Sequence, residues 1–262
     1  MSGDNNVEDN RIDAQKYYPV LLTCPHGDTV KVSPARKKSN LPSSCDPDQF
    51  TKDSDLFTLD LTQSIALNLY RLSRRDVYTN VTLVHRRFVD FNREAECAFE
   101  PSNDHLAEHL YNEYHTGIKK IIKKMRIQSN QGLCFLFDIH GTGETNADIY
   151  FGTDSTNPTG STICGLLERN PKALWDDSGL LKLLQVRGYS TVPASMNDPE
   201  LQSLDGGTTV RKFGGCSVNL RVEAIQCEVS SKLRENEVER EKFAKDMAEC
   251  ILQFISPYIT HS

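Results

Sequence analysis

Three apolar runs of this sequence lead directly into side chains that bind metal ions or move protons. Residues 21–24 lead into His26, residues 135–137 into Asp138 and His140, and residues 222–227 into Glu228. Neutral imidazoles and carboxylates are the ligands of a catalytic zinc ion, and a separate carboxylate can take a proton from water at the metal. These residue types therefore predict hydrolytic zinc chemistry, if the fold brings the three runs to one edge.

Each of these side chains also has a purely structural explanation. A histidine after a strand is more often a hydrogen-bonded core or loop residue than a ligand. Asp138 suits a turn or a helix cap, or it orients the imidazole of His140 from behind. Glu228 suits a surface carboxylate at a strand end. However, three separate structural explanations are less favoured than one, and a single functional site would explain why ionisable groups follow all three buried strands.

A fourth segment, residues 85–94, crowds charged side chains around two aromatic rings. The planar guanidinium of an arginine matches a carboxylate, and Asn92 adds a hydrogen-bond donor. The segment therefore favours a recess that binds an anion. A solvated network of surface ion pairs that includes Arg86 and Glu94 accounts for the same charges.

The elements that position these residues follow from the hydrophobic pattern. Short apolar runs predict strands at residues 19–24, 81–85, 133–137, 190–193 and 222–227. Apolar residues at helical spacing predict helices over about 53–72, 106–125 and 243–255. Strands that alternate with helices favour an α/β fold with a mixed, largely parallel sheet flanked by helices on both faces. In such sheets, sites form beyond the carboxyl ends of the strands.

The domain organisation is simple. Residues 1–16 are poor in apolar side chains and predict a disordered leader. Residues 32–51 predict a long polar loop, and no linker or repeat divides the rest of the chain. We expect one catalytic domain over residues 17–262.

The composition excludes several classes of partner. The 262 residues include 30 Lys and Arg against 36 Asp and Glu, so the net charge is −6. Nucleic acids and anionic membranes both attract basic surfaces, which makes either a poor candidate partner. No apolar run approaches the ~20 residues that cross a bilayer, and the polar first nineteen residues contain no secretory signal. We therefore expect a cytoplasmic protein that binds neither nucleic acid nor membranes.

The eight cysteines are scattered, and none forms a CxxC pair. Several lie inside apolar runs, as Cys24 and Cys134 do. Free thiols in a reducing compartment behave as small buried hydrophobes. The spacing therefore predicts buried free thiols rather than disulfides or a cysteine-based zinc site.

Six short motifs together resemble the N-formylglutamate amidohydrolase family in content and order. They are Pro25-His26-Gly27, Asp53-Ser54-Asp55, residues 87–93, Tyr114-His115, Asp138-Ile139-His140-Gly141 and Ile225-Gln226-Cys227-Glu228. The wider superfamily of zinc carboxypeptidases and aspartoacylases shows a similar succession. The resemblance covers about residues 21–233 and implies a zinc carboxypeptidase-like, phosphorylase/hydrolase-like fold.

The resemblance also implies roles for individual residues. His26 and His140 match the histidines that bind one zinc ion. Arg93, with Asn92, matches the pair that holds the substrate carboxylate, and Glu228 matches the general base.

The third metal ligand departs from the wider superfamily. There it is a glutamate three residues after the first histidine, a position that Thr29 occupies in this chain. Sequences similar to formylglutamate amidohydrolase have an acidic Asp-x-Asp segment instead, which favours Asp55. Asp53 is the next candidate, and Asp28 is a weaker one because it lies only two residues from His26.

Two further basic residues are candidates for contact with an acidic substrate. Arg87 would assist Arg93, and Arg211 would reach the substrate from residues 204–215. That glycine-rich segment predicts either a loop or hairpin, or a flap over the site. His115 lies at helical spacing on a partly apolar face, which suits a structural residue, yet Tyr-His also belongs to the family pattern.

These inferences lead to a zinc-dependent amidohydrolase, or a carboxypeptidase-like peptidase. The expected substrate is a small acidic N-acyl amino acid, similar to N-formylglutamate, or a glutamate-containing peptide. Two alternatives stay open. One is a non-catalytic relative that binds a ligand or a protein, which Thr29 favours, and the other is a deacylase that releases other N-acyl groups.

Overall fold

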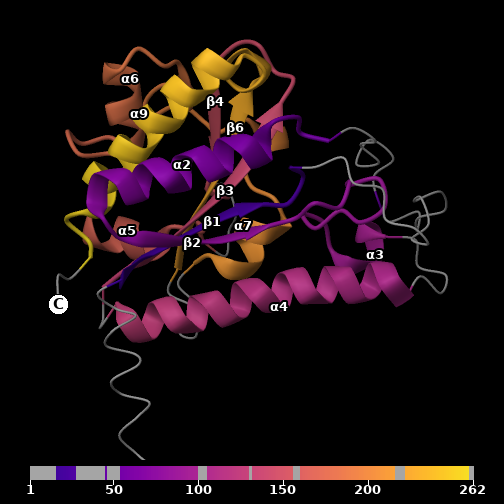
Figure 1. The fold of residues 1–262 in the computed structure, drawn as a ribbon. Coiled ribbons are helices and arrows are strands. Elements are labelled where there is room, and N and C mark those ends of the chain that lie inside the picture. Colours follow the sequence, from indigo (N-terminus) through magenta and orange to yellow (C-terminus); the bar gives the residue numbers. More distant parts are fainter. Residues whose placement is uncertain are drawn as a thin grey trace, which may run out of the picture.

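A six-stranded sheet runs through the molecule in the order β2-β1-β3-β6-β4-β5 (Figure 1). The computed structural model describes residues 16–27, 45, 54–99, 105–129, 132–155, 160–215 and 222–259. The strands are β1 (Tyr17–Cys24), β2 (Asp76–Val81), β3 (Cys134–Thr142), β4 (Ile149–Gly152), β5 (Thr191–Val192) and β6 (Val222–Ser230). All neighbours pair in parallel except β4, which runs antiparallel to β6.

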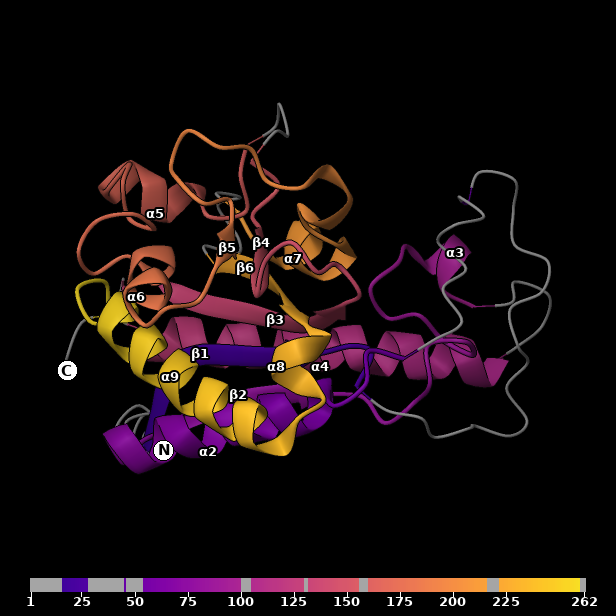
Figure 2. The same cartoon turned by 90° about the horizontal axis from the view of Figure 1, so that it is seen from above.

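Helices cover both faces of this sheet. The α2/α9 face carries α2 (Thr58–Ser73), α5 (Cys164–Arg169), α6 (Leu180–Val186) and α9 (Glu237–Ile255), and the α4 face carries α4 (His105–Gln128) and α7 (Thr208–Phe213). Figure 2 looks onto α9, with α4 behind the sheet. The short elements are α3 (Ala95–Ala98), α8 (Ser231–Arg234) and the 3₁₀ helix η2 (Gln202–Leu204). The predicted α/β fold class is confirmed.

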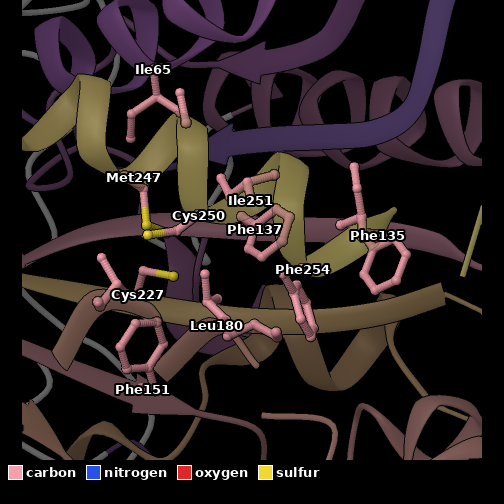
Figure 3. Packing of buried hydrophobic residues seen from close by; sticks show 14 of the residues in the cluster. Ile65, Phe135, Phe137, Phe151, Leu180, Cys227, Met247, Cys250, Ile251 and Phe254 are labelled. Atoms are coloured by element: carbon pink, nitrogen blue, oxygen red, sulfur yellow. The ribbon is translucent and has the colours of Figure 1, made fainter. Parts of the chain in front are cut away.

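Each covering layer has its own apolar core. Side chains alternate between the two faces of a strand, so Phe135 and Phe137 pack against α9 (Figure 3). Leu136, between them, packs in the α4 layer instead. Burying one such phenylalanine stabilises the fold by roughly 1.5–3 kcal/mol. The same alternation puts Asp138 and His140 on the face of Leu136. On this face of β3, apolar side chains therefore give way to ionisable ones after Leu136.

The strand boundaries correct the sequence predictions. The second strand covers Asp76–Val81 rather than residues 81–85, because Cys24, the last residue of β1, pairs with Val81 and leaves no partner beyond it. Strands β3 and β6 continue to Thr142 and Ser230. His140 and Glu228 therefore lie within the strands, two residues before their ends, rather than after them. Strand β4 and the helices α5 to α7 were not predicted.

The prediction about the cysteines is only partly correct. Cys24, Cys134, Cys227 and Cys250 are buried free thiols, as expected. Cys45 and Cys97, however, form a disulfide across 52 residues, and Cys164 is also disulfide-bonded. Spacing along the chain carries no information about which distant loops meet. Because disulfides persist mainly in oxidising compartments, the thiol pattern no longer supports the cytoplasmic prediction.

Two other predictions concern the limits of the chain. The leader over residues 1–16 and the loop over residues 32–51 fall almost entirely outside the described residues, and the single domain over residues 17–262 stays a prediction. None of the described helices combines the length and apolar character needed to cross a membrane.

Candidate metal centre

His26, Asp55 and His140 come from three distant segments and meet at the carboxyl edge of the parallel strands. His26 follows β1, Asp55 precedes α2, and His140 lies near the end of β3. The three side chains are buried, and one ligand atom from each lies within 4.8 Å of the other two. Two imidazoles and a carboxylate at this separation can hold a metal ion.

A carboxylate behind each imidazole decides which nitrogen faces the centre. His26 Nε2 lies 2.7 Å from Asp90 Oδ1, and His140 Nε2 lies 2.9 Å from Asp138 Oδ2. Such partners retain the proton on Nε2 and leave Nδ1 as the ligand atom. In both rings Nδ1 is 3.3 Å from the same atom, Oδ2 of Asp55.

This arrangement directs acceptors toward one another. With the proton on Nε2, two imidazole lone pairs face a carboxylate oxygen, which is favourable only with a cation or a proton between them. Burial alone would lower the pKa of His140, but the charges of Asp138 and Glu228 raise it well above its usual value. The site thus stabilises positive charge, and its donor set fits zinc.

Asp55 is held as a carboxylate. Burial would raise its pKa, yet the charge of His26 and the hydrogen bonds of both histidines lower it well below the usual value, with a further contribution from Arg86. The amide of Gly141 donates to Asp55 Oδ2 at 3.1 Å. An ionised aspartate in this position is ready to bind a cation.

Arg86 connects two of the acidic groups and was missed as a site residue. Its guanidinium lies 3.3 Å from Asp55 Oδ1 and 2.9 Å from Asp90 Oδ2, and the side chain is buried. The surface ion network considered for Arg86 is therefore wrong for this residue. Asp90 was also missed; its signal was a charged residue between the apolar neighbours Val89 and Phe91.

Glu228 lies on β6 beside the histidine of β3. Its Oε1 is 3.9 Å from His140 Nδ1 and accepts a hydrogen bond from Gln226 Nε2 at 3.1 Å. Burial raises the pKa of Glu228 to about 7, against the lowering effect of His140. A buried carboxyl group with a pKa near neutrality can both accept and return a proton.

A cavity of about 290 Å³ opens in front of these residues. Its lining includes the three candidate ligands and Glu228, together with Arg86, Asn92, Arg93, Gln226, residues 141–143, Ser203, Leu204, Gly206 and Gly207. Arg93 is partly exposed there, and its one ion pair within the described part of the chain is the 3.9 Å contact of Nε with Asp90. Arg93 is therefore a cavity-lining cation whose charge is only weakly paired.

Asn92 has a different setting from that expected of a substrate ligand. Its Oδ1 accepts a hydrogen bond from the Thr209 amide at 2.9 Å, and its Nδ2 donates to Gln226 Oε1 at 3.5 Å. Asn92 thus joins the start of α7 to β6, the strand that carries Glu228.

Two of the predicted substrate-binding residues do not line the cavity. Arg86 lines the cavity, but its neighbour Arg87 does not. Arg211 is 3.2 Å from Asp154 and 2.9 Å from Asp205, so its charge is already paired. Residues 208–213 of the segment predicted as a loop or flap form the helix α7, and Leu204, Gly206 and Gly207 before it line the cavity.

The remaining candidates separate clearly. His115 is buried among Tyr111, Tyr114 and Phe213, away from the cavity lining. Burial lowers its pKa to about 4, so its imidazole is neutral at pH 7. Asp28, Thr29 and Asp53 lie outside the described residues.

Comparison with solved structures supports the expected architecture. An N-formylglutamate amidohydrolase from Ralstonia eutropha JMP134 superposes with a TM-score of 0.60, covering 93% of this chain and 94% of that chain at 14% identity. A gene product from Agrobacterium tumefaciens gives 0.58, with 94% and 93% coverage at 16% identity. No protein-family model matches the sequence, and no curated protein does.

The chain has the fold of N-formylglutamate amidohydrolase. The resemblance found in the six short motifs is thereby confirmed at the level of the fold. At 14–16% identity, a shared fold does not carry a shared activity with it. The activity has to be argued from the residues of the cavity.

Proposed function

We propose that the protein is a zinc-dependent amidohydrolase. Its proposed substrate is a small acidic N-acyl amino acid, similar to N-formylglutamate, or a glutamate-containing peptide. Neither nucleic acid nor a membrane has a part in this proposal. The observation that carries it is the convergence of His26 Nδ1, His140 Nδ1 and Asp55 Oδ2 beside the buried carboxyl group of Glu228.

The residues of the cavity divide the chemical work. Bound zinc supplies Lewis acidity, which activates water and the amide carbonyl. Glu228 takes the proton of the attacking water and passes it to the leaving nitrogen. Its pKa of about 7 favours both transfers near neutral pH. Gln226 donates to Glu228 Oε1 and orients the carboxylate for both transfers.

Arg93 supports an acidic substrate. A guanidinium at the cavity wall binds a carboxylate in a bidentate manner and so places the scissile bond over the metal site. The volume of about 290 Å³ suits a small amino-acid derivative or the end of a peptide. Arg86 cannot take this role, because Asp55 and Asp90 already neutralise it.

The test is a hydrolysis assay on zinc-loaded protein with a panel of N-formyl, N-acetyl and longer N-acyl derivatives of glutamate and aspartate, together with γ-glutamyl peptides. Glu228→Gln should retain zinc and lose turnover, because the amide cannot accept the proton. Hydrolysis that survives this substitution would contradict the proposed mechanism. Preference for longer acyl groups would favour the deacylase alternative, and stoichiometric zinc with no hydrolysis of any compound would favour the non-catalytic one.

A further inference from the structure

Arg234 is a buried guanidinium that forms no salt bridge with the described residues, although the charges of Asp55 and Glu228 act on it. It ends α8, directly after β6, and only 5% of the residue is exposed. Its donors go to backbone carbonyls instead. Nε donates to Val229 O at 2.8 Å, Nη2 to Thr142 O at 3.2 Å, and Nη1 to Leu56 O.

The three carbonyls belong to the segments that carry two of the candidate metal ligands, Asp55 and His140, and the proposed base Glu228. Leu56 follows Asp55, Val229 follows Glu228, and Thr142 lies two residues after His140. One planar group therefore connects the loop before α2 to the ends of β3 and β6. These segments are distant in the sequence, and only β3 and β6 are joined by strand pairing.

Gly141 makes room for this connection. A Cβ atom at that position would lie 2.6 Å from Arg234 Nε, well inside contact distance. The amide of the same residue donates to Asp55 Oδ2. Gly141 of β3 thus lies next to Arg234 and also donates to the candidate metal ligand Asp55.

We propose that Arg234 is a positioning residue of the metal centre, which holds Asp55, His140 and Glu228 at the separations that zinc requires. This inference rests on the proposed zinc site. Arginine suits the role because its guanidinium presents donors in several fixed directions of one plane, whereas lysine presents its donors from a single point.

The experiment measures zinc affinity by chelator competition and the absorption spectrum of the cobalt(II)-substituted protein. Arg234→Met and Arg234→Lys should each weaken zinc binding about 10- to 100-fold, as is usual when a partner behind the ligands is lost. Both should change the cobalt spectrum. In Arg234→Ala, millimolar guanidinium should restore part of the affinity.

Arg75→Met is the matched control. Arg75 also donates to a backbone carbonyl, that of Tyr17 at 2.7 Å, but at the opposite end of β1 from the site. This variant should lower the melting temperature of the metal-free protein and leave zinc affinity and the cobalt spectrum unchanged.

The outcomes separate the two proposals. Wild-type protein that binds no zinc would contradict the proposed function itself. Wild-type affinity and an unchanged spectrum in the Arg234 variants, with only a lower melting temperature, would overturn the positioning role. Equal losses of affinity in Arg75→Met would overturn it as well. If Arg234→Met does not fold, Arg234→Lys and the guanidinium rescue decide the question.

Discussion

The two faces of β3 and β6 differ most at their carboxyl ends. On the α2/α9 face the apolar pattern continues through Ile139 and Val229. On the α4 face it changes from Leu136 to Asp138 and His140 within four residues. The backbone is the same for both faces, so the difference lies in what packs against each. The apolar face stabilises the sheet, and the other face uses that rigidity to hold buried charges.

This comparison is tested most strongly by removing a ligand from the polar face. His140→Ala deletes one of three candidate ligands, and a catalytic zinc site needs all three from the protein. We expect zinc to be absent from the purified variant and turnover to be abolished. Elemental analysis measures the first and the hydrolysis assay the second. Stoichiometric zinc in the variant would show that the metal is bound elsewhere.

A substitution on the apolar face should have the converse effect. Phe137 is fully buried in the α2/α9 core, so Phe137→Ala should lower the free energy of unfolding by about 3–5 kcal/mol. Urea unfolding measures this change. The zinc content of the folded variant should equal that of the wild type, and a loss of zinc would show that the two faces are not independent.

Glu223 is the exception on the apolar face and offers a pH test. It is buried, accepts a hydrogen bond from the Leu166 amide at 2.9 Å, and burial raises its pKa from 4.5 to about 7. Its contribution to stability is therefore complete below pH 4.5 and is lost as the pH rises through about 7.

Glu223→Gln should remove this loss and make the variant more stable than the wild type at pH 8, by up to about 3 kcal/mol. Unfolding curves between pH 5 and pH 8 in urea give the comparison. If the difference between the two proteins does not change with pH, Glu223 does not titrate in this range.

The smallest effects concern two arginines that the sequence predicted to bind the substrate, Arg93 and Arg211. Loss of a hydrogen bond to a charged group costs about 1.5–3 kcal/mol, so Arg93→Ala should raise KM about tenfold or more. Arg211→Ala should leave KM unchanged, because Arg211 is paired with Asp154 and Asp205 outside the cavity lining. Steady-state kinetics measure KM for both variants. A larger rise in KM for Arg211→Ala than for Arg93→Ala would show that Arg211 contacts the substrate.

The fold was predictable where the pattern is local. Continuous apolar runs identified β1, β3 and β6, because strands buried on both faces contain apolar residues at successive positions. Their ends were not predictable in the same way. Strand β3 continues to Thr142 because β6 pairs with it that far, whatever the polarity of the side chains. The position of β2 likewise depends on its pairing with β1.

The candidate site divides along the same line. His26, His140 and Glu228 were recognisable because their types suit zinc chemistry and each follows an apolar run. Asp90 and Arg86 could not be recognised as partners of the site, since charged residues of this kind are ordinarily exposed. Only packing buries them next to His26 and Asp55.

The sequence by itself determined which chemical groups the protein can offer and which strands carry them. That information is local, because residue type and hydrophobic period are properties of short segments. The tertiary structure decided that both imidazoles present Nδ1 to Asp55, that Arg234 joins three segments, and that Cys45 meets Cys97. These contacts join residues far apart in the chain, and their geometry arises only when the two helix layers close on the sheet.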